Sequence, residues 1–241
     1  MRTLLLLAFL LLPAWGQIDP LRPAEEPTLG FRVGLGYGPF GGRGIGVDEG
    51  GPYAFTRAGH DLRLEVGLSW RATQEVSLEG AVGLSLLLLG EERVREGRRE
   101  ASWWGEGGWG LQVGAAYRLR ELPGRPRVYL GARYPWGLEG GVSLAFLRDP
   151  VVATLGGSLD WSPGEPPVLG VGLGLGLVAN EVWSLGVGAS LRVPLGVEPP
   201  GGALFLRAGY SLDPEGKGEV AVRGSLGDGG FRLRVEWAGG L

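Results

Sequence analysis

Apolar and polar residues alternate with a period of two along most of this chain. In the first alternating segment, residues 29–37, the apolar face consists of Leu29, Phe31, Val33, Leu35 and Tyr37. Successive side chains of a β-strand point to opposite faces, so this period predicts strands with one apolar face. Comparable segments follow at residues 61–70, 75–88, 109–119, 127–134, 138–147, 151–161, 168–178, 182–193, 203–212, 218–226 and 230–237.

The connections between these segments alternate in length. The short ones are residues 71–74, 120–126, 148–150, 179–181 and 213–217. The longer ones are residues 39–59, 90–102, 162–167 and 194–202, whereas 135–137 and 227–229 are tight. Apolar stripes of roughly 9–11 residues, with short turns at one end and longer loops at the other, are typical of a membrane-spanning barrel. The pattern therefore predicts an all-β fold, a closed antiparallel up-and-down transmembrane β-barrel.

The number of strands depends on how the chain is divided at Pro135. Residues 128–146 keep one phase across this proline, and a single strand there would give eleven strands with the termini on opposite sides. Bacterial barrels of this kind have an even number of strands. We therefore expect a break at Pro135 and about twelve strands, with ten as the alternative.

Aromatic residues gather at the ends of the apolar stripes, which distinguishes a membrane barrel from a soluble β-sandwich. They are Phe31, Tyr37, Trp70, Tyr117, Tyr134, Trp136, Trp161, Trp183, Tyr210 and Trp237. Trp and Tyr favour the boundary between water and lipid and form two girdles around membrane barrels. The polar face mixes small residues with arginines and carboxylates, as the limited space of a lumen requires.

The N-terminus has the composition of an export signal. Residues 1–16 contain Arg2, an apolar run from Leu4 to Leu12 and a small-residue ending, and this layout predicts a cleaved signal peptide. Residues 17–27 are proline-rich and are expected to form a periplasmic tail, which leaves residues 28–241 for the barrel. The chain has no cysteine, which excludes disulfides and an anchor on a lipidated cysteine.

Taken together, these features resemble the bacterial outer-membrane β-barrel proteins over residues 28–241. The resemblance implies a location in the cell outer membrane, contact with outer-membrane lipids and assembly by the barrel-assembly machinery. In most members of this family the last strand ends in an aromatic residue, which the assembly machinery recognises. Here the last strand is followed by residues 238–241, and Leu241 keeps the outward phase without being aromatic.

Few residues suggest chemistry. His60 precedes Asp61, and an Asp–His pair could activate water at the rim, but neighbours in a strand point to opposite faces. We therefore expect an interfacial histidine and no enzyme. Two G-x-G-x-x-G matches, at Gly36 and Gly105, do not lead from a strand into a helix, and metal clusters of His and Cys are excluded. We expect no cofactor, and the net charge of −3 gives no reason to expect nucleic acid as a partner.

The charged run at residues 91–100 is expected in an outer loop. A solvated loop is the simplest interpretation, and contact with surface polymer or anionic lipid head groups is the alternative.

The predicted inner face is more informative. Its bases are Arg32, Arg63, Arg118, Arg133, Arg192, Arg207, Arg223, Arg232 and Arg234, and its acids are Asp61, Glu65, Glu75, Glu79, Glu139, Asp160, Glu219 and Glu236. Nine bases against eight acids suggest extensive pairing and argue against strong anion selectivity. Glycines at positions 170, 172, 174, 176, 186 and 188 predict a nearly bare wall opposite the densest charges.

We select as candidate lumen-lining residues those of the charged side and of the bare wall. They are Arg32, Asp61, Arg63, Glu65, Glu219, Arg223, Arg232, Arg234, Glu236, Gly170, Gly172, Gly174 and Gly176. The space along the glycines could hold a passage, or the loop at residues 39–59 folded inward, or simply the long charged side chains. Twelve strands lie between filled and open barrels, so either outcome is compatible with the size.

The sequence thus favours a narrow channel for passive or weakly selective passage of small solutes. The alternative is a structural or surface-interaction barrel with a plugged lumen. A hydrolase at the rim ranks third.

Overall fold

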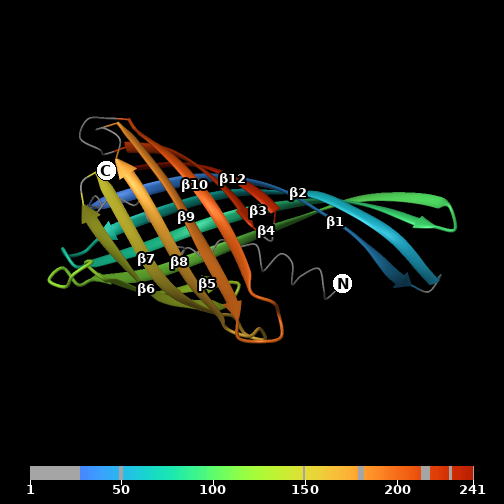
Figure 1. Cartoon of the computed structure of the whole chain (residues 1–241), viewed down its shortest axis with the longest axis horizontal. Helices are drawn as coiled ribbons and strands as arrows, with labels where there is room; N and C mark the ends of the chain where they lie inside the picture. Colours follow the sequence, from blue (N-terminus) through green and yellow to red (C-terminus); the bar gives the residue numbers. More distant parts are fainter. Residues whose placement is uncertain are drawn as a thin grey trace.

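The computed structural model describes residues 28–48, 51–148, 150–178, 182–212, 218–227 and 230–240. Within these ranges the chain forms twelve strands: β1 (Leu29–Asp48), β2 (Gly51–Arg71), β3 (Val76–Arg95), β4 (Arg98–Arg118), β5 (Arg127–Tyr134), β6 (Gly137–Arg148), β7 (Val151–Trp161), β8 (Val168–Val178), β9 (Trp183–Pro194), β10 (Gly201–Ser211), β11 (Gly218–Gly227) and β12 (Gly230–Gly240). Each pairs antiparallel with the next, and β12 pairs with β1, so the sheet closes into a barrel (Figure 1).

The barrel closes where its first strand, β1, pairs with its last strand, β12. The register of β1 and β12 runs from Gly30 opposite Gly240 to Tyr37 opposite Leu233. Between β5 and β6 the chain turns at Pro135 and Trp136. The predicted barrel of twelve antiparallel strands, with its break at Pro135, is therefore confirmed. The predicted signal peptide and tail, residues 1–27, lie outside the described residues.

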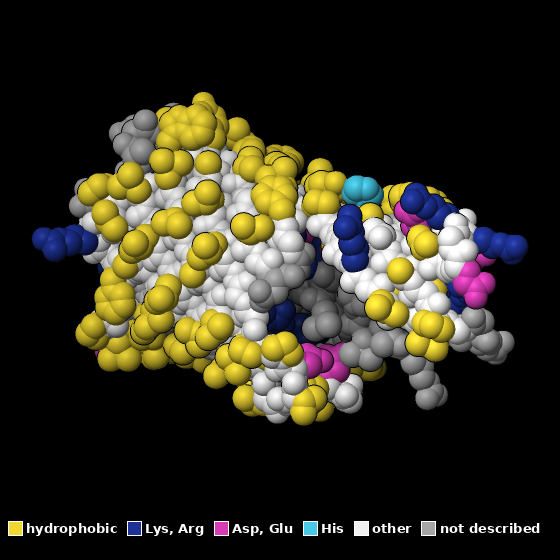
Figure 2. All heavy atoms as spheres, turned by 45° about the vertical axis from the view of Figure 1, so that its right-hand side comes forward, with side chains coloured by type: hydrophobic (Ala, Val, Ile, Leu, Met, Phe, Trp, Pro, Cys, Tyr) yellow, Lys and Arg dark blue, Asp and Glu magenta, His cyan; other side chains and the backbone are white. Residues whose placement is uncertain are grey.

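The barrel has its apolar side chains on the outside. Leu35, Leu130 and Leu206 are 59%, 67% and 65% exposed, whereas the inward carboxylates Glu65 and Glu139 are only 6% and 4% exposed. Figure 2 shows hydrophobic side chains spread over the outer surface of the barrel. An apolar outer face with a polar interior is what a barrel surrounded by lipid requires. No helix in the described residues is long and apolar enough to cross a membrane.

Aromatic side chains meet at both ends of this apolar band. Near one end, the ring centroids of Phe31 and Trp237 are 4.9 Å apart, and Trp183 packs against a tyrosine of β10. At the other end, Trp109 and Tyr134 lie 4.8 Å apart. Tyrosine and tryptophan pairs at the two limits of the band form the expected girdles.

Strands β1–β4 are much longer than the others. They have 20 or 21 residues, whereas β5–β12 have 8 to 12. Their pairing continues to Asp48 opposite Gly51 and to Arg95 opposite Arg98. In Figure 1 these four strands rise far beyond the rest of the barrel. We call residues 39–48, 51–60, 88–95 and 98–105, which lie in mutual register, the extension.

The extension corrects two predictions. The outer loops expected at residues 39–59 and 90–102 are paired strands over the described residues 39–48, 51–59, 90–95 and 98–102, and residues 39–48 continue away from the barrel, so they do not fold into its lumen. The charged run at residues 91–100 likewise lies in β3 and β4, which are joined by a two-residue turn with positive φ at Glu96 and Gly97. That geometry suits the right-handed twist of a β-hairpin.

Aromatic rings explain why such a glycine-rich segment is a strand. Phe55 lies across Gly44, where a Cβ would be only 2.7 Å from the ring, and Tyr53 covers Gly46 in the same way. Phe40 covers Gly59 of the neighbouring strand. The missing side chains of the glycines are thus replaced by rings from the adjacent strand, a recognised way of stabilising glycine in a sheet.

Candidate functional site

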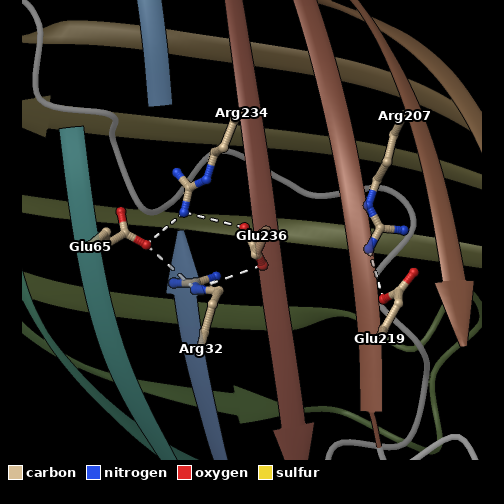
Figure 3. A network of polar contacts seen from close by, with 6 residues as sticks. All are labelled: Arg32, Glu65, Arg207, Glu219, Arg234 and Glu236. Atoms are coloured by element: carbon tan, nitrogen blue, oxygen red, sulfur yellow. Dashed lines mark hydrogen bonds and ion pairs between the residues drawn. The ribbon is translucent and has the colours of Figure 1, made fainter. Parts of the chain in front are cut away.

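The densest charges of the lumen come from strands at the two ends of the chain. Glu65 of β2 lies 3.5 Å from Arg32 of β1 and 2.6 Å from Arg234 of β12. Glu236 of β12 approaches the same two guanidiniums at 3.8 and 3.2 Å. Two carboxylates are therefore shared by two arginines across three adjacent strands (Figure 3). The charges of this network cancel within it.

Two further ion pairs flank the network. Arg207 of β10 donates to Glu219 of β11 at 2.8 Å, and Ser184 donates to the same carboxylate at 3.2 Å. On β2, Nη2 of Arg63 donates a hydrogen bond to Oδ2 of Asp61 at 2.6 Å. The pairing expected from the balance of inward charges therefore exists on this side of the barrel. We call strands β10, β11, β12, β1 and β2, with their inward charges, the charged seam.

The seam contains a row of three arginines. The strand register places Arg207 directly opposite Arg223, and Arg223 directly opposite Arg234. The guanidinium of Arg223 lies over the ring of Phe205, 4.2 Å from its centroid. Like charges directly opposite one another destabilise a sheet, so the seam maintains an arrangement that costs free energy.

Phe205 connects the seam to the glycine wall. It is 5% exposed and covers Gly188 of β9, so that a Cβ at that glycine would collide with the ring. Phe205 points inward because it has the phase of Arg207, whereas Leu204 and Leu206 face outward. This inward aromatic side chain was missed in the sequence, although the alternation of residues 203–207 contains the signal.

The predicted glycine wall lies on β8 and its neighbours. Gly172 pairs with Gly156, Gly174 with Gly188, and Gly176 with Gly186. At one end of β8 the side chain of Ser158 contacts Gly170, and Thr154 donates to the Gly174 carbonyl at 3.5 Å. The wall is therefore bordered by small polar groups, and Phe205 covers part of it.

The opposite side of the lumen contains a base that the sequence analysis omitted. Arg127 of β5 pairs with Glu79 of β3 and lies 3.4 Å from Ser77. Arg127 is an even number of residues from Arg133 on the same strand, so both side chains point to the same face. Since Arg133 was assigned inward, the alternation alone would have identified Arg127 as inward too. With Arg127 added to the nine predicted bases, ten inward bases face eight acids. Gln112 donates to Glu139 on the same side.

Another group of inward charges lies towards the end of the barrel from which the extension rises, whereas Arg118 and Glu75 lie at the other end, where the Arg118 N–H donates to the Glu75 carbonyl at 2.8 Å. Arg232 lies beside Gly38 and within electrostatic range of Arg63 and Arg192. Arg133 donates to Ser162 at 3.0 Å, and Asp160, opposite Glu139 in register, is 5% exposed. Figure 2 shows the molecule hollowed beside the base of the extension, with acidic and basic side chains at the hollow.

A second carboxylate cluster occupies the extension. Nε of Arg57 and Nε of Arg93 donate to the two oxygens of Glu91, which is 2% exposed. Arg57 stacks 4.6 Å above Phe55, and Arg93 stacks 4.9 Å above Tyr53. Desolvation raises the pKa of the Glu91 carboxyl, but the hydrogen bonds and charges of the two arginines outweigh it, so the pKa lies below its ordinary value.

His60 and Asp61 do not form a catalytic pair. The Tyr37 hydroxyl lies 2.9 Å from Nδ1 of His60, and the two rings stack on the outer face. Asp61 is buried on the inner face with Arg63. The expected divergence of these neighbours is confirmed. In the part of the chain that the structure describes, no three His, Cys, Asp or Glu residues are grouped as metal ligands would be.

A groove of about 640 Å³ lies on the outer face of the barrel. Its lining includes Leu175, Leu177, Leu185, Val187 and Leu206. Since these side chains face outward, lipid chains would fill the groove, and we do not assign it to the lumen.

Comparisons with known proteins agree with the architecture. No protein-family model and no curated protein matches the chain. Among solved structures, the COG4313 outer membrane channel from Pseudomonas putida F1 is 14% identical, with a TM-score of 0.56 over 92% of this chain and 99% of that one.

The KdgM porin is 11% identical, with a TM-score of 0.55 over 86% of this chain and 99% of its own. The transport unit of the autotransporter AIDA-I from Escherichia coli is 8% identical, with a TM-score of 0.54 over 90% and 91% of the two chains. At these identities the likeness concerns the fold alone.

Proposed function

We propose that this protein is an integral outer-membrane channel through which small polar solutes pass passively, with weak selectivity. The observation that carries the proposal is the closed barrel with an apolar outer face and a charged inner wall. The ion pairs along this wall present polar groups that can be hydrated, so water and polar solutes can find partners inside the barrel.

The arrangement of the lumen supports a narrow passage. Eight-stranded barrels are filled by their side chains and 16-stranded barrels hold an aqueous channel, so twelve strands allow a restricted one. Phe205, Arg223 and the seam side chains occupy part of the interior, whereas the glycines of β8 contribute no side chain. The near balance of ten bases and eight acids favours weak selectivity.

The proposal includes the route to the membrane. Residues 1–16 direct export and are cleaved, residues 17–27 remain on the periplasmic side, and the extension lies outside the cell. The barrel-assembly machinery inserts the barrel, with β12 as its last strand, and outer-membrane lipids surround it. The fold shared with the COG4313 channel and the KdgM porin is consistent with this assignment.

Solute flux into liposomes tests the proposal. Residues 17–241, refolded into vesicles, should admit small sugars and amino acids and exclude solutes of several hundred daltons more strongly. Gly174→Trp should slow this flux, because the indole would project from the glycine wall into the lumen. Leu173→Trp, one residue away on the outward face, is the matched control and should not. Vesicles that exclude all solutes would overturn the proposal.

A second candidate function is interaction at the cell surface. The extension favours it, because Ile45, Val47 and Trp103 are 81%, 78% and 72% exposed on strands that rise above the rim. Replacing residues 40–58 and 90–104 by short turns separates the two functions. A channel function alone predicts unchanged flux and unchanged attachment of cells to surfaces, whereas a surface function predicts that this attachment is lost.

A further inference from the structure

We propose that Arg207, Arg223 and Arg234 form an anion-binding site at the middle of the lumen, which takes the carboxylate of a small organic acid during its passage. The inference deepens the channel function proposed above and rests on it. It names carboxylate-bearing solutes as the preferred class and locates the site on β10, β11 and β12.

The row is defined by the backbone register. Arg223 is directly opposite Arg207 on one side and Arg234 on the other. Directly opposite Cβ atoms in an antiparallel sheet are about 5 Å apart, so the three arginine side chains start from adjacent positions on one wall of the lumen. Each residue lies near the middle of its strand, away from both rims.

The carboxylates of the seam do not balance its arginines. Glu65 and Glu236 are shared between Arg32 and Arg234, and Glu219 serves Arg207. Among the predicted inward charges, the five strands of the seam carry six arginines and four carboxylates. The arginines are Arg32, Arg63, Arg207, Arg223, Arg232 and Arg234, and the carboxylates are Asp61, Glu65, Glu219 and Glu236. The surplus of positive charge favours an anion at this wall.

Two details suit a carboxylate in particular. Arg223 contacts Phe205 through the face of its guanidinium, whereas a carboxylate binds the N–H edge, so the two contacts are compatible. Phe205 itself is fixed against Gly188, which orients the stacked guanidinium. In addition, Nε of Arg234 is a buried donor without a hydrogen-bond acceptor in the described residues. An anion oxygen would provide one.

The glycine wall leaves space for the uncharged part of the solute. Positions 172, 174 and 176 of β8 carry no side chains, so the body of a small acid can pass along this wall while its carboxylate contacts the row. A flat wall of glycines makes few specific contacts. The site therefore selects for the charged group and leaves the rest of the solute unspecified.

The test compares the middle arginine with an inward arginine outside the row. Binding of succinate to the refolded protein in detergent is measured by titration calorimetry, and block of the chloride current by succinate is measured in bilayers. Arg223→Gln should weaken both by about tenfold, the loss expected for a charge-assisted hydrogen bond. Arg192→Gln on β9 removes the same charge and should leave succinate affinity within about twofold. Arg223→Lys should retain anion preference yet bind succinate more weakly, because an ammonium lacks the planar fork.

The outcomes are separable. Unchanged succinate binding in Arg223→Gln, or equal weakening in both neutral variants, would overturn the site and indicate a general lumen potential. A wild-type protein that binds succinate through Arg223 but passes no current would uphold the site and overturn the channel function. Strand content by circular dichroism confirms that each variant is folded.

Discussion

Two clusters in this molecule use the same chemistry in different surroundings. In the charged seam, Glu65 lies between Arg32 and Arg234, and in the extension, Glu91 lies between Arg57 and Arg93. The seam arginine side chains are 17% and 27% exposed, whereas those of the extension are 40% and 43% exposed.

The clusters also differ in what they join. Arg234 and Glu65 are 169 residues apart and link the last strand to the second across the barrel closure. Arg57 and Glu91 are 34 residues apart on neighbouring strands, and Arg93 follows Glu91 by two. The comparison shows that a carboxylate between two arginines can stabilise the closure of the whole barrel or only a local part of the sheet. Which of the two it does depends on the strands that supply the three residues.

The largest expected effect is the loss of the seam carboxylate. Glu65→Gln leaves the mostly buried Arg32 and Arg234 with Glu236 as the remaining carboxylate of the network, and removing one partner of a buried ionic cluster typically costs about 3 kcal/mol. Urea unfolding in lipid vesicles should show this loss. Glu91→Gln is the matched control and should cost under about 1 kcal/mol, because its partners are exposed and screened. Equal losses would refute the contrast between the two clusters.

The next effect concerns glycines that lie under rings in the two regions. A Cβ at Gly188 meets the ring of Phe205 and lies 2.5 Å from the Leu173 carbonyl, so Gly188→Ala should cost about 2 kcal/mol. At Gly44 only the ring of Phe55 is close, and it can swing away from the exposed sheet. Gly44→Ala should therefore cost less, as measured by the same unfolding experiment. The reverse order would show that Phe205 is the more mobile ring.

A smaller effect is expected from acid. Because the pKa of Glu91 is held below 4.5, its ion pairs contribute stability above that value and lose it only as pH falls through the lowered pKa. The protection of the amide hydrogens of residues 53–57 and 91–95, measured relative to the intrinsic exchange rate at each pH, should therefore stay constant from pH 7 down to about 5 and decrease only in more acidic solution. Loss of protection already near pH 6 would contradict this assignment.

The smallest effect is predicted for His60. Its contacts are with exposed Tyr37 on the outer face, and an exposed substitution of this kind changes stability by less than about 0.5 kcal/mol. His60→Ala should unfold like the wild-type protein. A loss of several kcal/mol would mean that the outer girdle depends on this contact.

The sequence predicted the barrel well because alternation is a local property. The alternation of side chains along each strand assigned Leu35 to the outer face and Arg63 to the inner face without any knowledge of the neighbouring strands. Applied to every residue, the same rule would have assigned Arg127 and Phe205 to the inner face. The extension was missed for a physical reason: residues 39–48 are rich in glycine, and only the rings of Phe55 and Tyr53 on the next strand make this segment a stable strand.

Other features of the site depend on information that a sequence does not contain. That Arg207, Arg223 and Arg234 form one row follows from the register of three strands, and register is set by closure of the whole sheet. That Arg234 contacts Glu65 depends on β12 meeting β1, which places the two residues on strands separated only by β1.

The central claim is that the charged lumen conducts. Single-channel recording of refolded residues 17–241 in a planar bilayer, with a potassium chloride gradient, tests it most directly. The account predicts stable conductance steps and a reversal potential that indicates a modest preference for chloride. A correctly folded barrel that gives no steps, or one that prefers potassium strongly, would contradict it.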